Sequence, residues 1–190
     1  MSDLFPTMVT MRLKLRPITL ADVDALFHIH SDAETMQWYG VDALTQRSEG
    51  IRLAELFSGW FAAGTGFRWG LERHEDGRLI GSCGLFRWNR SWRNCVTGYE
   101  LARDCHGQGY MREALEVVLA YGFDEMQLHR IQAEAHGSNA ASIGLAQRMG
   151  FAFEGIHREQ GYWNGQFHDL HCFSLLEDDW YAKRAANPAA

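Results

Sequence analysis

The sequence lacks any uninterrupted apolar run of the roughly 20 residues that a membrane-spanning helix needs. It also contains no C-x-x-C pair among its four cysteines, which are Cys83, Cys95, Cys105 and Cys172. Its first residues do not have the pattern of a secretory signal, so no disulfide framework is expected and the cytoplasm is the expected location. No internal repeat or long Pro/Gly/Ser linker divides the 190 residues. We therefore expect one domain over residues 1–183 and a loose tail over 184–190.

An excess of positive charge is also missing, since the formal net charge is -6. A general nucleic-acid binder needs a basic surface, because contacts to phosphates supply most of its affinity. Neither nucleic acid nor a membrane is therefore an expected partner. An acidic surface suits a cationic partner such as an amine, although many proteins are mildly acidic without one. Apolar residues make up 46% of the chain and aromatic residues 13%, which is enough for a sizeable core.

Hydrophobic periodicity predicts an α+β chain with the element order βααβββαβαββ. Strands are predicted over residues 11–16, 67–72, 78–86, 94–102, 130–135, 151–157 and 167–176. Helices are predicted over residues 19–30, 47–62, 109–126 and 139–149. Thr19 and Asn139 are the expected N-caps of the first and last helices, and Gly150 is expected to end the last one. Asp76-Gly77 is typical of a hairpin turn.

The most informative segment joins the strand that ends near residue 102 to the helix that begins near Gly109. It holds Gly107 and Gly109 with one residue between them, and the helix follows at once. Glycines let a backbone approach phosphate oxygens closely, and the first amides of a helix favour an anion. The segment is not a P-loop, since no Gly-Lys-Ser/Thr follows, and Arg112 breaks the G-x-G-x-x-G spacing. A lone G-x-G is also a common turn without a ligand, so the surrounding motifs are needed to interpret it.

Several motifs stand in order around this loop. They are Leu13-Lys14-Leu15-Arg16-Pro17, Ile80-Gly81-Ser82-Cys83-Gly84, Gly98-Tyr99-Glu100-Leu101, Gly107-Gln108-Gly109-Tyr110-Met111-Arg112-Glu113-Ala114, Asn139-Ala140-Ala141-Ser142 and Met149-Gly150-Phe151. The series resembles the GNAT N-acetyltransferase superfamily over about residues 11–178. Within it, the series is similar to the Rim-type (ribosomal-protein-alanine N-acetyltransferase-like) branch, which acetylates protein N-terminal amines. The resemblance implies a GNAT fold: a mixed, mostly antiparallel sheet, splayed at the cofactor strand, with helices on both faces.

The resemblance also implies that acetyl-CoA is the co-substrate. In this family the pantetheine arm pairs with the splayed strand as an extra strand, and the glycine-loop amides hold the pyrophosphate. The implied cofactor-binding residues are Leu101, Ala102, Arg103, His106, Gly107, Gln108, Gly109, Tyr110, Met111, Asn139 and Ser142. The amide of Leu101 is the implied donor to the thioester oxygen, and Ser142 is expected near the sulfur.

Two positions depart from the family pattern. Asp104 stands three residues before the first glycine, where Gln or Arg is usual, and an acid beside a diphosphate is unfavourable unless it turns to solvent. Ala146 stands where many members place a tyrosine that protonates the leaving thiolate. The Rim-type branch often lacks this tyrosine, and Ser142 is then the candidate acid, with simple helix capping as its alternative role.

Acetyl transfer to an amine needs a base, a donor that polarises the thioester oxygen, and a proton for the leaving thiolate. Glu100 and Ser142 are the predicted catalytic residues, with Glu100 as the base. A solvent-facing salt bridge is the alternative role of Glu100, and Glu154 is the second candidate for the base. The pairs Trp38-Tyr39 and Tyr162-Trp163 are predicted to line the amine pocket, with core packing as the alternative.

No metal site is expected from the histidine spacing. His28 and His30 are two residues apart on a predicted helix, so their side chains point about 200° apart. His168 and His171 are three apart on a predicted strand and face opposite sides of it.

These features together predict acetyl transfer by direct attack in a ternary complex. The expected acceptor is a primary amine, above all the N-terminal amine of a protein or peptide. The alternatives are a small amine, such as a polyamine, aminoglycoside or amino acid, and a non-catalytic acyl-CoA-binding regulatory module. The chain is expected to be a monomer or a homodimer.

Overall fold

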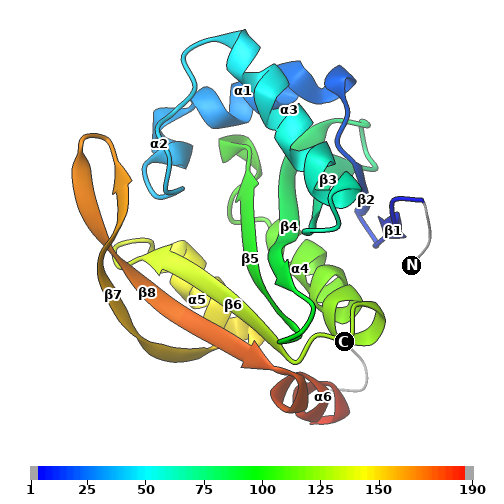
Figure 1. Ribbon diagram of the computed structural model, residues 1–190. Coiled ribbons are helices and arrows are strands. Elements are labelled where there is room, and N and C mark those ends of the chain that lie inside the picture. Colours follow the sequence, from blue (N-terminus) through cyan, green and yellow to red (C-terminus); the bar gives the residue numbers. More distant parts are fainter. Residues whose placement is uncertain (1–3, 187–190) are drawn as a thin grey trace.

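The computed structural model describes residues 4–186, in which eight strands form one mixed sheet (Figure 1). The strands are β1 (Met8–Val9), β2 (Leu13–Pro17), β3 (Phe67–Arg73), β4 (Leu79–Asn89), β5 (Asn94–Leu101), β6 (Arg130–His136), β7 (Ala152–Trp163) and β8 (Gln166–Leu176). Their order across the sheet is β1-β2-β3-β4-β5-β6-β8-β7. Among the strands of residues 4–186, only β5 and β6 pair in parallel, and the other pairs are antiparallel. The predicted mixed, mostly antiparallel sheet is thus confirmed.

Helices cover both faces of the sheet, as predicted (Figure 1). They are α1 (Val23–Ser31), α2 (Ala33–Met36), α3 (Arg47–Ala62), α4 (Tyr110–Ala120), α5 (Ala140–Met149) and α6 (Glu177–Ala186). Alternation along β3 explains how both faces are filled. The Trp69 ring lies 5.4 Å from that of Tyr121, which follows α4, whereas the guanidinium of Arg68 lies 4.9 Å from the Phe57 ring of α3. Within residues 4–186, no helix is both long and apolar enough to cross a membrane.

The predicted helix over residues 109–126 is interrupted. It divides into α4 and a π-helical turn, Tyr121–Glu125. Gly122 lies in this turn, where an added Cβ would stand 3.0 Å from the side chains of both Ile131 and Leu85. The absence of a side chain lets the turn pack closely against the sheet, and periodicity alone does not reveal such a change of helix type.

Other boundaries also differ from the prediction. Strand β7 extends six residues beyond the predicted end at 157. The prediction ended too early because these residues are mostly exposed and show no alternation of apolar and polar side chains. The short elements β1 and α2 were not predicted. The tail predicted from residue 184 is wrong for its first three residues, which complete α6, and residues 187–190 lie outside the described part of the chain. Helix α6 is anchored by Trp180, which is buried and stacks on Phe123 at 5.7 Å.

Candidate active site

The sheet opens between β5 and β6. Their parallel pairing ends at Thr97 and Ala133, although β5 stays paired with β4 as far as Leu101, and β6 stays paired with β8 as far as His136. The facing edges of the two strands therefore separate, which confirms the predicted splay (Figure 1). An edge of this kind offers unpaired backbone groups to an extended ligand.

The orientation of the β5 backbone follows from its last hydrogen bond. The amide of Ala102 donates to the carbonyl of Ile80 on the β4 side at 2.7 Å, so this amide is already used. Because successive residues of a strand point their backbone groups to opposite edges, the N–H and C=O of Leu101 face the open side. The Leu101 carbonyl there accepts a hydrogen bond from Nε2 of His106 at 3.0 Å.

The glycine loop ends at the N-terminus of α4. Gly107 has φ +73° and Gly109, the N-cap of α4, has φ +82°, a left-handed conformation that favours glycine. In the part of the chain that the structure describes, no side chain caps this helix end. The amides of its first turn, which carries the buried Tyr110 and Met111, are therefore available to an anion.

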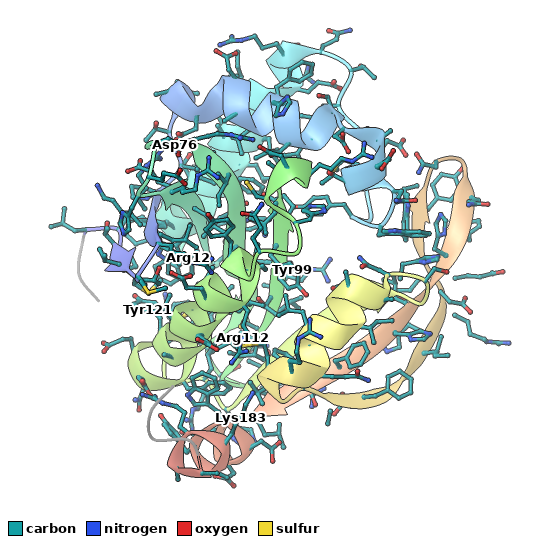
Figure 2. The ribbon with its side chains drawn as sticks, turned by 180° about the vertical axis from the view of Figure 1, so that it is seen from behind. Arg12, Asp76, Tyr99, Arg112, Tyr121 and Lys183 are labelled. Atoms are coloured by element: carbon teal, nitrogen blue, oxygen red, sulfur yellow. The ribbon has the colours of Figure 1, made fainter. Side chains whose placement is uncertain are left out.

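Arg12, the residue before β2, holds this loop in place (Figure 2). Its Nη1 donates to the carbonyl of Gln108 at 3.0 Å, and its Nε lies 2.6 Å from a carboxylate oxygen of Glu113. Its guanidinium also lies 4.4 Å from the centre of the Tyr110 ring. The loop is thus held from outside. The amide of His106 donates to the carbonyl of Arg103 at 3.1 Å, which leaves the amides from Gly107 to Met111 for an anion.

Helix α5 begins on the same side of the sheet. Oδ1 of Asn139 accepts a hydrogen bond from the amide of Ser142 at 3.0 Å, which confirms Asn139 as the N-cap, and Gly150 ends the helix at φ +97°. The Ser142 hydroxyl is hydrogen-bonded to the hydroxyl of Tyr99 at 2.9 Å. Figure 2 shows Tyr99 between α4 and α5. Burial raises the pKa of Tyr99 to about 12.

Glu100 points to the opposite face of β5, where its carboxylate is enclosed. It is 5% exposed and is contacted by Nη2 of Arg68 and the hydroxyl of Ser82. The hydroxyl of Tyr39 donates to it at 2.9 Å, and Nε2 of His30 lies 3.5 Å from it. The alternative role, a solvent-facing salt bridge, is therefore wrong about the solvent and right about the salt bridge, which Glu100 forms with Arg68 in the interior.

Comparisons with known proteins agree with this geometry. The model of the Acetyltransferase (GNAT) domain family matches residues 12–152, which is most of the chain. The chain belongs to the GNAT acetyltransferase family. It is accordingly an acetyl-CoA-dependent N-acetyltransferase, as predicted, rather than a non-catalytic acyl-CoA-binding module.

Relatives of this GNAT chain include the uncharacterized N-acetyltransferase YoaA of Bacillus subtilis (strain 168), 33% identical over 92% of this chain and 98% of the relative. The [Ribosomal protein uS5]-alanine N-acetyltransferase of Escherichia coli (strain K12) is 30% identical over 62% of this chain and 61% of its own length. Among solved structures, a spermidine N-acetyltransferase from Vibrio cholerae in complex with CoA and spermine has a TM-score of 0.79. It is 22% identical and covers 90% of this chain and 99% of that one.

The acid that departs from the GNAT loop pattern is neutralised. Asp104 accepts two hydrogen bonds from the guanidinium of Arg78, at 2.5 and 2.8 Å, and these hold the pKa of Asp104 below its usual range. The Asp104 carboxylate is therefore paired with Arg78. The next residue back, Arg103, reaches Glu34 of α2 at 2.5 Å and lines a cavity of about 750 Å³ beside α1.

The charge state of Glu100 follows from its surroundings. Burial acts to raise its pKa, but the charge of Arg68 and the hydrogen bonds to the carboxylate outweigh burial and lower the pKa to about 2. Glu100 is therefore an anion throughout the physiological pH range. The Glu154 carboxylate accepts hydrogen bonds from Nη1 of Arg130 and from the hydroxyl of Ser174, each at 2.8 Å. Arg130 lies where β5 and β6 are still paired, so these contacts hold Glu154 away from the splay.

The four aromatic residues that were predicted to line the amine pocket lie in three different parts of the structure. Trp38 and Trp163 meet around His136, since the Trp38 ring stacks on it at 4.6 Å and the Trp163 ring approaches it edge-on at 5.9 Å. Tyr39 instead covers Glu100. Tyr162 is 61% exposed and packs on Phe167 at 4.9 Å, away from the others. Trp163 is 2% exposed and also stacks on His168 at 3.7 Å, which favours the core-packing alternative for it, whereas Trp38 is half-buried.

Sequence reasoning missed the partners of the two predicted catalytic residues. His30, Arg68 and Ser82 reach Glu100 from three other elements, and Tyr99 reaches Ser142. One signal was present: Arg68 is the charged residue in the otherwise uncharged first five residues of β3, all of which are buried, and a buried charge requires a partner. The register then places Ser82 opposite Glu100 and Arg68 opposite Gly84, two residues from Ser82 and therefore on the same face of the sheet.

Proposed function

We propose that this chain acetylates the N-terminal α-amine of a protein or peptide by direct attack within a ternary complex. The observation that carries this proposal is the pairing of Glu100 with Arg68. With its pKa lowered to about 2, Glu100 is a weak proton acceptor. A site of this kind suits an acceptor amine that is already partly neutral.

The ordinary pKa values of amines separate the acceptor classes. An α-amino group has a pKa of about 7.7–8.0, so roughly one molecule in ten is neutral at pH 7. A lysine-like amine has a pKa of about 10.4, so only about one in 2,500 is neutral. The site therefore favours an α-amine over the amines of polyamines. The Escherichia coli relative, whose name specifies an alanine of a ribosomal protein, supports the same class, whereas the Vibrio cholerae likeness supports the fold alone.

Acetyl-CoA supplies an activated acetyl thioester when bound. The open edge of β5, the left-handed glycines and the uncapped end of α4 fit this co-substrate. We assign its binding to Leu101, Ala102 and Arg103 and to the loop from His106 to Met111, with Asn139 and Ser142 on the pantetheine side. The Leu101 amide, which faces the splay, donates to the thioester oxygen.

The reaction forms an N–C bond and breaks a C–S bond. Glu100, as a buried anion, attracts and orients the amine, and water takes up the proton that the nitrogen loses. Trp38, half-buried beside His136, flanks the acceptor. Ser142 gives a proton to the departing sulfur, and the hydroxyl of Tyr99, 2.9 Å away, returns one to Ser142. Tyr99 then takes a proton back from water, so the proton that the amine releases balances the one that the thiol gains. Tyr99 thereby does from β5 what a tyrosine at position 146 does in other GNAT enzymes. We also retain the cytoplasm as the proposed location.

A thiol-release assay with a panel of acceptors tests the proposal. The panel pairs a peptide with a free N-terminal alanine against the same peptide with a blocked N-terminus and one internal lysine, and adds spermidine. We expect release of CoA above background only with the free N-terminus. Turnover with spermidine and none with any peptide would refute the assigned acceptor while leaving acetyl transfer intact.

A further inference from the structure

Three side chains with metal-ligand chemistry meet on the sheet well away from the glycine loop. They are Glu134 on β6, His157 on β7 and Cys172 on β8, and one ligand atom from each lies within 4.8 Å of the others. The strand register explains the meeting. Glu134 pairs with Cys172, and His157 pairs with Leu170, two residues before Cys172 and therefore on the same face.

This face is accessible. Figure 1 shows it in front of β6, β8 and β7, where no helix within residues 4–186 covers it, while α5 lies behind. The three residues line a hollow of about 210 Å³. The neighbouring Glu154 also lines the hollow, but its carboxylate is engaged by Arg130 and Ser174.

The three groups are held only weakly by their present contacts. Nδ1 of His157 lies 4.0 Å from Oε1 of Glu134, and Sγ of Cys172 donates a long hydrogen bond to the Leu170 carbonyl at 3.5 Å. The His157 side chain is 58% exposed, so its ring is free to turn. Small side-chain rotations on three paired strands are enough to bring the ligand atoms together.

We propose that Glu134, His157 and Cys172 bind one divalent transition-metal ion of the Zn²⁺ class. A tetrahedral Zn²⁺ site has Zn–S near 2.3 Å and Zn–N and Zn–O near 2.0 Å, which places its ligand atoms about 3.3–3.5 Å apart. The separations here need to shrink by roughly 1 Å or slightly more to reach those values. Three protein ligands leave the fourth position to water. Thiolate and imidazole select Zn²⁺ or Co²⁺ over Mg²⁺ and Ca²⁺, which prefer oxygen alone.

Titration with Co²⁺ tests the ligand set directly. The full chain, without a histidine tag and purified in chelator, is titrated with Co²⁺ and followed by absorption. We expect one Co²⁺ per chain, a thiolate-to-cobalt charge-transfer band, and its loss on addition of Zn²⁺. Cys172→Ser should abolish the band, and His157→Gln should weaken Co²⁺ binding at least about tenfold.

His129→Gln is the matched control, because His129 is also exposed and its Nδ1 lies 3.6 Å from a carboxylate of Glu177. This variant should bind Co²⁺ as the original chain does. Absence of the band in the original chain, or its persistence in Cys172→Ser, would overturn the proposal.

A second measurement needs no variant. Cys172 is half-buried, whereas Cys83, Cys95 and Cys105 are buried, so Cys172 is the thiol open to an alkylating reagent and the other three are internal controls. Zn²⁺ should slow alkylation of Cys172, read by peptide mass spectrometry, at least about tenfold, and Mg²⁺ should not. An unchanged alkylation rate in Zn²⁺ would contradict the site.

Discussion

Glu100 now makes the folded state more stable as the pH rises. Replacing Arg68 by methionine should reverse the sign of this contribution, so that Glu100 makes the folded state less stable as the pH rises. Both side chains are 2% exposed and form a buried ion pair. Arg68 is a main cause of the lowering of the Glu100 pKa from 4.5 to about 2. That difference of roughly 2.5 pKa units corresponds to about 3 kcal/mol of folding free energy. Because the folded-state pKa is lowered, this stabilisation is present above about pH 4.5 and is lost as the pH falls toward 2.

In Arg68→Met, Glu100 stays buried and loses its arginine partner, while His30, Ser82 and Tyr39 remain beside it. We expect burial to outweigh these remaining contacts and to raise the pKa of Glu100 above 4.5. The protonated form then fits the folded state, and stability falls as the pH rises through the new pKa. At pH 7 the variant should be about 3–5 kcal/mol less stable, the magnitude typical of an uncompensated buried charge. At pH 4 the deficit should be smaller by about 2 kcal/mol or more.

Urea denaturation at pH 4 and pH 7 measures both deficits. Arg112→Met is the control, because Arg112 is 60% exposed and pairs with Glu116 one helical turn away on α4. It should change the unfolding free energy by no more than about 0.5 kcal/mol at either pH. Arg68 also donates to the Gly98 carbonyl at 2.8 Å, and loss of that bond is independent of pH. An equal deficit at both pH values would therefore refute the electrostatic account of Glu100.

Three further predictions concern activity and cofactor binding. Tyr99→Phe should lower kcat about tenfold, with the Kd for CoA unchanged, and an unchanged kcat would remove the proton relay through Ser142. Arg78→Ala should weaken CoA binding, measured by calorimetry, about fivefold, because Asp104 is then unneutralised beside the pyrophosphate loop. Adding Asp104→Asn should restore the affinity, and a double variant as weak as Arg78→Ala would contradict this reasoning. Glu100→Gln should keep CoA affinity and lower kcat. Its pH profile of kcat/KM should keep a midpoint near the acceptor pKa, about 7.7–8.0, so a moved midpoint would show that Glu100 titrates there.

The parts of the fold that local chemistry specifies could be predicted from the sequence. Helix α3 spans Arg47–Ala62, as its apolar stripe predicts, and Asn139 and Gly150 begin and end α5 as their conformational preferences require. The left-handed glycines of the loop follow the same logic. The elements that the prediction missed or made too short are those whose residues are mostly exposed. An example is the part of β7 after residue 157, where apolar residues do not recur at regular intervals.

The candidate site was predictable only in part, because its chemistry depends on contacts between distant residues. The motif around Glu100 identified the carboxylate, but its charge state depends on Arg68, which lies 32 positions earlier in the sequence. Asp104 was flagged as unfavourable, and its partner Arg78 lies 26 positions away. Strand register brings these pairs together, and the sequence does not specify that register locally.

The most direct test of the assigned acceptor is the position of the transferred acetyl group. One peptide with a free N-terminal alanine and an internal lysine is incubated with the enzyme, isotope-labelled acetyl-CoA and an equal concentration of spermidine. The products are then sequenced by tandem mass spectrometry. The account predicts label on the α-amine of the alanine. Label on the lysine side chain or on spermidine, with the α-amine unmodified, would contradict it.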